Sequence, residues 1–245
     1  MKVLLLGASG ATGRLVLKQL LDKQIETKIV IRALSGISES HQNNKLLESI
    51  VGNISEFSPD EYSKLVADCD TVISCLGHNI SFKGIFGKPR KLVTNCIKNI
   101  CNSILKTKTD ITKLILMSTT AYRNTQVKEN YGVWDRAVLS SLYYLLPPHR
   151  DNVEAGLYLV NTIGVDKPKI EWVMVRPDGL IDEENESEYK IHQSPNRSPI
   201  FDPGKASRIN VSAFMIKLLL DENFWNEWRY KLPVLYNTEL KTKEN

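Results

Sequence analysis

Val3-Leu4-Leu5-Leu6-Gly7-Ala8-Ser9-Gly10-Ala11-Thr12-Gly13 is the stretch of sequence that decides the fold. Four apolar residues that end at a glycine are typical of a strand buried on both faces of a parallel sheet. The next segment carries apolar residues at helical spacing, at Leu15, Val16, Leu20 and Leu21. This pattern predicts a helix, and the β-branched residues 27–31 predict a second strand. The chain therefore opens with one strand-helix-strand unit.

The alternation of strands and helices continues beyond this unit. Further strands are predicted at residues 47–51, 70–75, 114–117 and 170–175. Helices are predicted after Ser58-Pro59, over residues 88–106 with Pro89 in the first turn, over 151–162 and around 211–219. The economical arrangement is an α/β fold with a doubly wound parallel sheet of six strands, in one domain over residues 1–245.

Composition and charge narrow the function classes. The chain has 245 residues, of which 42% are hydrophobic and 24% charged, which excludes fibrous and wholly disordered proteins. The net charge of +4 is spread along the chain, so we expect neither a nucleic acid nor a membrane as a partner. A small molecule, in particular an anionic one, suits this charge.

The cysteines and the amino-terminus indicate the compartment. Cys69, Cys75, Cys96 and Cys101 form no C-x-x-C pair and lie in stretches that predict buried strand or helix. We expect reduced, packed thiols and no metal site. Only four apolar residues precede Gly7, which is too few for an export signal, so we expect a cytoplasmic protein.

Two stretches are longer than simple connections. Residues 119–150 are rich in tyrosine, and residues 181–206 are first acidic and then rich in turn formers. Both follow late strands, so both should lie at the carboxyl edge of the sheet, where doubly wound proteins bind ligands. We expect residues 182–245 to form a small carboxy-terminal region that contributes a substrate lid and a last helix.

Each glycine of the opening stretch has a mechanical task. Gly7 permits the tight turn, Gly10 lacks a Cβ that would hold a pyrophosphate away, and Gly13 lets the helix pack closely on the sheet. Free N–H groups then remain at a positive helix terminus. We therefore expect this loop to bind a dinucleotide, through Gly7, Ser9, Gly10, Ala11, Thr12 and Gly13.

Arg32 favours NADP over NAD. An NAD enzyme places a carboxylate after the second strand to hold the ribose 2′-hydroxyl, but here no carboxylate follows until Glu39. The guanidinium of Arg32 can pair with a 2′-phosphate, a charge-assisted contact worth roughly 1.5 to 3 kcal/mol, or about one to two orders of magnitude in affinity. NAD stays possible, since Arg32 can also be a solvated charge at the end of a strand.

The motifs resemble the short-chain dehydrogenase/reductase superfamily. Within it, Gly-Ala-Ser-Gly-Ala-Thr-Gly at 7–13, Ser118-Thr119-Thr120 and Val175-Arg176-Pro177 look like the atypical, NmrA-like branch, across nearly the whole chain. The resemblance implies a Rossmann fold. It also implies further cofactor contacts, at Asn53 near the adenine, at Ser74, Cys75, Leu76 and Gly77 beside the ribose, and at Ser118 and Pro177 near the nicotinamide.

The catalytic set of the superfamily is only partly present. Its members usually carry a Ser, then a Tyr about a dozen residues later, then a Lys four beyond the Tyr. Ser118 and Tyr131 match and are the candidate catalytic residues, but Asp135 stands where the Lys is expected. A carboxylate raises the pKa of a nearby phenol, so Tyr131 is a poor acid. His78 and His149 are further candidate proton donors.

Two functions remain open. The first is an NADP-dependent oxidoreductase that transfers a hydride to a small, conjugated acceptor such as a flavin, a quinone or a carbonyl compound. The second is a noncatalytic sensor that binds NADP(H) and acts through a protein partner, which the missing lysine favours. Epimerase chemistry ranks last, because it demands the full Tyr and Lys pair. The sequence does not predict the substrate or the oligomeric state.

Overall fold

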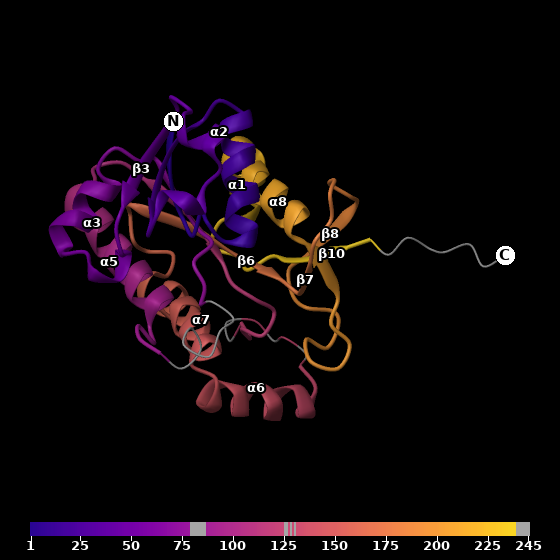
Figure 1. The fold of residues 1–245 in the computed structure, drawn as a ribbon. Helices are drawn as coiled ribbons and strands as arrows, with labels where there is room; N and C mark the ends of the chain where they lie inside the picture. Colours follow the sequence, from indigo (N-terminus) through magenta and orange to yellow (C-terminus); the bar gives the residue numbers. More distant parts are fainter. Residues whose placement is uncertain (79–86, 125–126, 128, 130, 239–245) are drawn as a thin grey trace.

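The main sheet is the frame of the molecule. The computed structural model describes residues 1–78, 87–124, 127, 129 and 131–238. The strands of the main sheet are β1 (Lys2–Leu6), β2 (Glu26–Ile31), β3 (Leu47–Val51), β4 (Thr71–Ser74), β5 (Thr112–Met117), β6 (Ile170–Pro177), β8 (Tyr189–His192) and β10 (Val234–Asn237). Their order is β3-β2-β1-β4-β5-β6-β10-β8 (Figure 1). The reversal of strand order between β1 and β4 is the switch point of a doubly wound sheet.

The predicted parallel sheet is confirmed and extended. The strands from β3 to β6 in this order, and β10 next to β6, run parallel. The sheet has eight strands where six were predicted, because β10 and the antiparallel β8 close its far side. These added strands are only four residues long, and β8 has no buried residue, whereas β10 has a short buried run at Val234, Leu235 and Tyr236.

Helices cover both faces of the sheet. On one face lie α1 (Ala11–Asp22), α8 (Arg208–Leu220) and α9 (Glu222–Trp228), and on the other α3 (Pro59–Val66), α5 (Leu92–Thr107) and α7 (Pro147–Tyr158) (Figure 1). Side chains of β1 alternate between the two cores, since Val3 and Leu5 belong to the first and Leu4 and Leu6 to the second. The four cysteines are buried free thiols, as predicted.

The starts of α3 and α5 are capped in different ways, α3 by neighbouring residues and α5 by a residue far away in the sequence. The predicted start of α3 is confirmed, with Ser58 and Glu61 forming a reciprocal capping box and Pro59 in the first turn. The predicted start of the helix at 88 is wrong, because α5 begins at Leu92 and Pro89 precedes it. The carboxylate of Asp151 accepts the N–H groups of Val93 and Thr94 at the start of α5, so a distant residue caps this helix.

The segments expected to be long connections carry structure of their own. Residues 133–145 form α6 (Val133–Leu145), and α7 begins at Pro147, four residues before the predicted 151. Residues 159–163 continue α7 as a π-helix. Within 181–206, β8 joins the main sheet and β9 (Lys205–Ser207) pairs with β7 (Gly179–Ile181). Strand pairing therefore holds both parts of the stretch 181–206 in place, and the stretch is not structureless.

A buried ion pair ties the second half of the chain to β6. The side chains of Arg176 and Glu129 are both 0% exposed, with Nη2 to Oε1 at 2.7 Å and Nη1 to Oε2 at 3.1 Å. Other guanidinium N–H groups donate to the carbonyl oxygens of Tyr122 and Leu232. Because every one of these partners is a fixed acceptor, Arg176 holds the segment after β5 and the entry to β10 against one strand.

Glu129→Gln should destabilise the fold strongly. It leaves the guanidinium charge of Arg176 buried without a counter-charge, which costs about 3 to 5 kcal/mol in the free energy of unfolding, measured by urea denaturation. The matched control is Asp182→Asn, which breaks an Arg–Asp pair whose carboxylate is 84% exposed and should cost at most about 1 kcal/mol. Equal losses in the two variants would show that the buried pair has no special role.

Candidate functional site

The glycine loop joins β1, α1 and the end of β4 at one point. Gly7 has a φ of +78°, and a Cβ atom placed on it would lie 2.5 Å from the carbonyl oxygen of Cys75. A Cβ atom on Gly13 would lie 2.1 Å from the carbonyl oxygen of Gly7. Any side chain at either position collides with backbone, so this contact exists only with glycine.

The amino-terminus of α1 has no internal cap. Gly10 is its N-cap residue, no side chain hydrogen-bonds to it there, and its first turn has no acidic residue. The rim formed by Ser9, Gly10 and Ala11 is exposed, whereas Thr12 and Gly13 are buried. The first amide groups of a helix have no partner within the helix, so here they can serve an external anion. The arrangement fits the phosphates of a nucleotide.

Two further predicted residues follow β2 and β3. Arg32 is exposed at the end of β2, and the turn that follows it packs on the glycine loop, since a Cβ atom on Gly36 would lie 3.1 Å from Cβ of Ser9. Asn53 follows β3, where its side-chain oxygen accepts hydrogen bonds from Ser55 and its amide donates to Glu56 at 2.7 Å. Asn53 therefore already shapes the turn that precedes α3.

The remaining predicted residues stand at the carboxyl ends of β4, β5 and β6. Ser74 and Cys75 are buried, Leu76 is half-buried and Gly77 is exposed. The amide of Ser118 donates to Val175 at 2.8 Å and that of Thr120 to Pro177 at 3.3 Å, which brings Ser118 and Pro177 to the same edge. The hydroxyl oxygens of Ser74 and Ser118 are buried and have no protein partner within the described residues.

Tyr131 has a structural contact that the sequence did not reveal. Its hydroxyl donates to the carbonyl oxygen of Thr120 at 2.6 Å, and burial, with the charge of Glu129, raises its pKa. Asp135, at the position of the missing lysine, accepts from Ser198 at 2.5 Å instead. The phenol is therefore held by backbone, and the carboxylate holds the stretch before β9.

Sequence reasoning did not pair His78 with Asp151. Nε2 of His78 lies 2.7 Å from Oδ2 of Asp151, with the two side chains 6% and 0% exposed. Burial alone would raise the pKa of Asp151, but the hydrogen bonds from His78, Thr94 and Val93 outweigh it and lower the pKa. The residues are 73 positions apart, so no local pattern could have indicated the contact.

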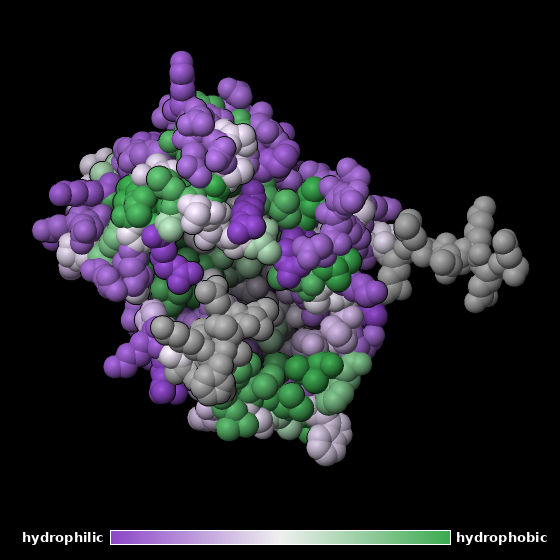
Figure 2. Space-filling view, in the orientation of Figure 1, coloured by the Kyte–Doolittle hydropathy of each residue, from purple (hydrophilic) through white to green (hydrophobic). Residues whose placement is uncertain are grey.

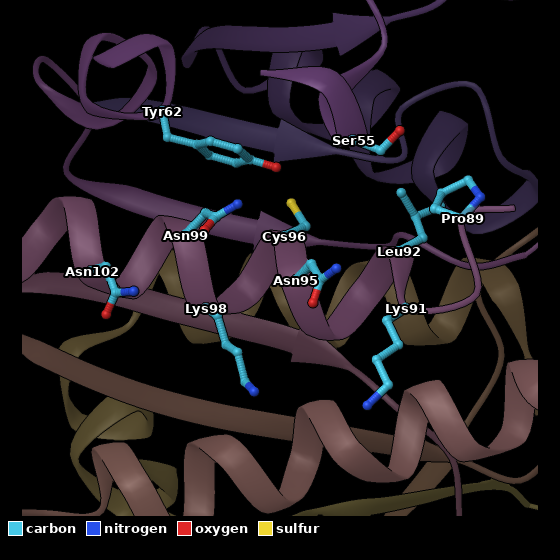
Figure 3. A pocket seen from close by; sticks show the side chains of 10 residues that line it. All are labelled: Ser55, Tyr62, Pro89, Lys91, Leu92, Asn95, Cys96, Lys98, Asn99 and Asn102. Atoms are coloured by element: carbon cyan, nitrogen blue, oxygen red, sulfur yellow. The ribbon is translucent and has the colours of Figure 1, made fainter. Parts of the chain in front are cut away.

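Two hollows reach the carboxyl edge. A pocket of about 350 Å³ lies between α3 and α5, and Figure 3 shows Tyr62 above Cys96 and Asn99. One end of this pocket is lined by Ser55, which hydrogen-bonds to Asn53, and by the start of α5. Figure 2 shows a second hollow near the middle of the face, above the apolar surface of α6, where Val133 and Leu145 are exposed.

Across the described residues, no group of His, Cys, Asp and Glu side chains is placed to hold a metal ion. In the same part of the chain, each helix is too short or too polar to cross a membrane.

The comparisons with known proteins point to one family and one fold. The model of a family described as NAD(P)H-binding matches residues 7–222. No curated protein matches the chain.

Three solved structures illustrate the likeness of fold. They are the oxidoreductase ylbE from Lactococcus lactis (16% identity, 97% of this chain and 91% of that one, TM-score 0.69), a short-chain dehydrogenase/reductase from Veillonella parvula in complex with NADP (12%, 97% and 95%, 0.66), and ChuY, an anaerobilin reductase from Escherichia coli O157:H7 (16%, 98% and 99%, 0.66). At these identities the likeness establishes the fold.

Asp151→Asn should remove a pH-dependent part of the stability. The pKa of Asp151 is lower in the folded than in the unfolded protein, so its contribution is present above the unfolded-state value of about 3.9 and is lost as the pH falls through the folded-state pKa. At pH 7 we expect a loss of about 1 to 3 kcal/mol in the free energy of unfolding. Denaturant curves of both proteins from pH 7 to pH 3 should converge on the acid side.

The control for this measurement is Asp110→Asn, which neutralises an exposed carboxylate. Such a surface substitution should change the stability by less than about 0.5 kcal/mol. A constant gap between wild type and Asp151→Asn across the whole pH range would contradict the assigned role of the charge.

Proposed function

The chain belongs to the NAD(P)H-binding family, and we propose on that premise that it is an NADP-dependent oxidoreductase that transfers a hydride to a small conjugated acceptor. The observation that carries the proposal is the uncapped start of α1, packed through glycine contacts against the end of β4. The acceptor classes are a flavin, a quinone or a carbonyl compound. ChuY, which shares this fold, is an anaerobilin reductase and supports the choice of a reductase.

The phosphates would lie on the glycine loop. The amides of Ser9, Ala11 and Thr12 would donate to the pyrophosphate, favoured by the positive end of the α1 dipole. The amide of Gly10 already donates to the carbonyl oxygen of Gly7 at 2.9 Å, so Gly10 would contribute by its lack of a side chain. Gly7 and Gly13 would contribute by the close backbone contacts that expose these amides. No acidic side chain stands in the first turn of α1 to repel the anion.

The two ends of the cofactor would follow the strand ends. Asn53 would lie near the adenine, and the run Ser74, Cys75, Leu76 and Gly77 beside the ribose and the centre of the cofactor. The hydroxyl of Ser118 and the ring of Pro177 would flank the nicotinamide. Support for Ser118 comes from its buried hydroxyl, which can still make a hydrogen bond to a ligand.

NADP is preferred over NAD because of Arg32. The guanidinium is exposed, and the turn that follows it packs on Ser9. The end of β2 and the glycine loop are therefore adjacent, and together they would contact the adenine-side ribose. A carboxylate that would favour the 2′-hydroxyl is missing between Arg32 and Ser38.

Residues 182–245, of which 239–245 lie outside the described part, would cover the acceptor. The hydrogen bond from Ser198 to Asp135 supports this, because it connects the stretch before β9 with α6 across the carboxyl edge. Bound NADPH would supply the hydride. The protein would orient the acceptor and exclude water between α6 and this stretch.

Gly10→Ala tests cofactor binding. The new Cβ atom would lie 3.2 Å from the carbonyl oxygen of Gly7, and Gly10 has a φ of −76°, so the fold should tolerate it. It would project from the phosphate loop, so we expect NADPH affinity to fall at least tenfold by calorimetry, and turnover of a panel of flavins, quinones and aldehydes to fall with it. NADPH binding without turnover of any acceptor would favour the sensor.

The matched control is Gly132→Ala. Its Cβ atom would meet Asp135 at 3.1 Å, a similar crowding, but at the start of α6 rather than α1. NADPH affinity should stay at the wild-type value. An equal loss in both variants would show that crowding, not position in the loop, causes the effect.

Arg32→Glu tests the choice of dinucleotide. The carboxylate would repel the 2′-phosphate and accept from a 2′-hydroxyl, so NADPH affinity should fall about ten- to hundredfold while NADH affinity rises or holds. Lys45→Glu makes the same charge change on an exposed side chain before β3, at the opposite edge of the sheet, and should alter neither affinity. An unchanged NADPH affinity in Arg32→Glu would remove the assignment.

A further inference from the structure

A histidine and an aspartate meet at the carboxyl edge without a part in the proposed cofactor site. His78 follows β4, and Asp151 is the fifth residue of α7. Their Nε2 and Oδ2 atoms are 2.7 Å apart, and both side chains are almost completely buried. Ionisable groups are costly to bury unless they are hydrogen-bonded, so a buried pair of this kind needs an explanation.

The carboxylate of Asp151 is fixed in position. Oδ2 accepts from the amide of Val93 at 2.8 Å, and Oδ1 from the amide of Thr94 at 2.9 Å. The hydroxyl of Thr94 donates to the backbone oxygen of Asp151 at 2.9 Å. The positive end of α5 and these donors favour the ionised carboxylate, and they lower its pKa.

An ionised carboxylate only accepts hydrogen bonds, which fixes the orientation of the imidazole. Nε2 of His78 must carry the hydrogen that points at Asp151. Nδ1 is then the ring nitrogen that can exchange a proton with a bound molecule. This is the arrangement in which a carboxylate orients a histidine for acid and base chemistry.

The backbone places His78 at the same edge of the sheet as the proposed hydride donor. The carbonyl oxygen of Cys75 abuts Gly7, and His78 follows only three residues later. β4 pairs with β5, so His78 and Ser118 extend from neighbouring strands at the same edge. The phenol of Tyr131 is unsuited to the task, because Thr120 binds it and burial raises its pKa.

A pocket opens beside Asp151. It measures about 290 Å³ and is lined by Asp151, Tyr143, Tyr144 and three cations, Arg90, Lys91 and Arg150. Lys91 and Arg150 both bind the carboxylate of Glu154, at 2.6 and 2.7 Å. Three cations therefore stand against two carboxylates, Glu154 and Asp151, and two tyrosine rings also line the pocket.

We propose that His78, held by Asp151, donates the proton in the reduction, and that the acceptor is accordingly a carbonyl compound. This inference rests on the proposed oxidoreductase function and narrows its acceptor class. Hydride addition to a carbonyl leaves a strongly basic alkoxide oxygen that needs a proton at once. Quinones and flavins spread the added electrons over a ring system and can take their proton from solvent.

The reduction transfers one hydride and one proton to the carbonyl group. The carbonyl carbon accepts a hydride, with its two electrons, from NADPH, which is oxidised to NADP⁺. The electron pair of the C=O π bond moves to the oxygen, and this oxygen takes the proton from Nδ1 of the protonated His78. The product is an alcohol, and the neutral imidazole recovers its proton from solvent.

His78→Gln separates the two acceptor classes. We expect NADPH affinity to match wild type by calorimetry, turnover of menadione to stay within about threefold, and turnover of aromatic aldehydes and enones to fall about a hundredfold. Asp151→Asn should also lower the turnover of aldehydes and enones more than the turnover of menadione, but by a smaller factor than His78→Gln. The control His41→Gln, on the short helix α2 (Glu39–Gln42), should leave all three measurements unchanged.

A second readout needs no turnover. The chain has four histidines, so ¹⁵N spectra of labelled wild-type protein are simple to assign with the two histidine variants. In the neutral ring of His78, we expect the hydrogen on Nε2 and a bare Nδ1. The opposite tautomer would overturn the proposal.

The other outcomes are also decisive. Equal losses for aldehydes and menadione in His78→Gln, or a wild-type protein that reduces menadione but no carbonyl compound, would overturn this inference and leave the oxidoreductase standing. A wild-type protein that binds no NADPH would overturn the proposed function, and this inference with it.

Discussion

The architecture depends on two close backbone contacts near the start of the chain. Gly13 lies so near the carbonyl oxygen of Gly7, and Gly7 so near that of Cys75, that a single Cβ atom at either site would overlap backbone. The first helix therefore sits directly on the first and fourth strands. This contact places the uncapped start of α1 at the switch point of the sheet, where an anion meets free amides and a favourable dipole.

Buried charge organises the other half of the carboxyl edge. Arg176 binds Glu129 and backbone carbonyls, and so fixes the segment after β5 next to the entry of β10. Asp151 caps α5 and binds His78, so that one carboxylate joins α5, α7 and the end of β4. Groups of this kind are costly to bury and stable only when every donor and acceptor is matched. They hold the segments around the site in one arrangement.

Much of the first half of the fold could be predicted, because its signals are local. The buried strands were evident from short apolar runs, and the start of α3 from Ser58-Pro59, since a capping box is made within four residues. The start of α5 was predicted too early, because its cap comes from Asp151. The strands β8 and β10 were missed, since each is short and is defined by pairing with a distant strand rather than by its own pattern.

By itself the sequence determined the doubly wound fold, the NAD(P)H-binding class and the glycine turn between the first strand and the first helix, because glycine spacing and strand-helix alternation act between neighbours in the chain. Only the tertiary structure decided what Tyr131, Asp135, His78 and Asp151 do. The phenol of Tyr131 donates to the carbonyl oxygen of Thr120, and the carboxylate of Asp135 accepts from Ser198. The carboxylate of Asp151 binds His78. Such contacts join residues that are far apart along the chain, and they exist only once the sheet has brought the ends of its strands to a common edge.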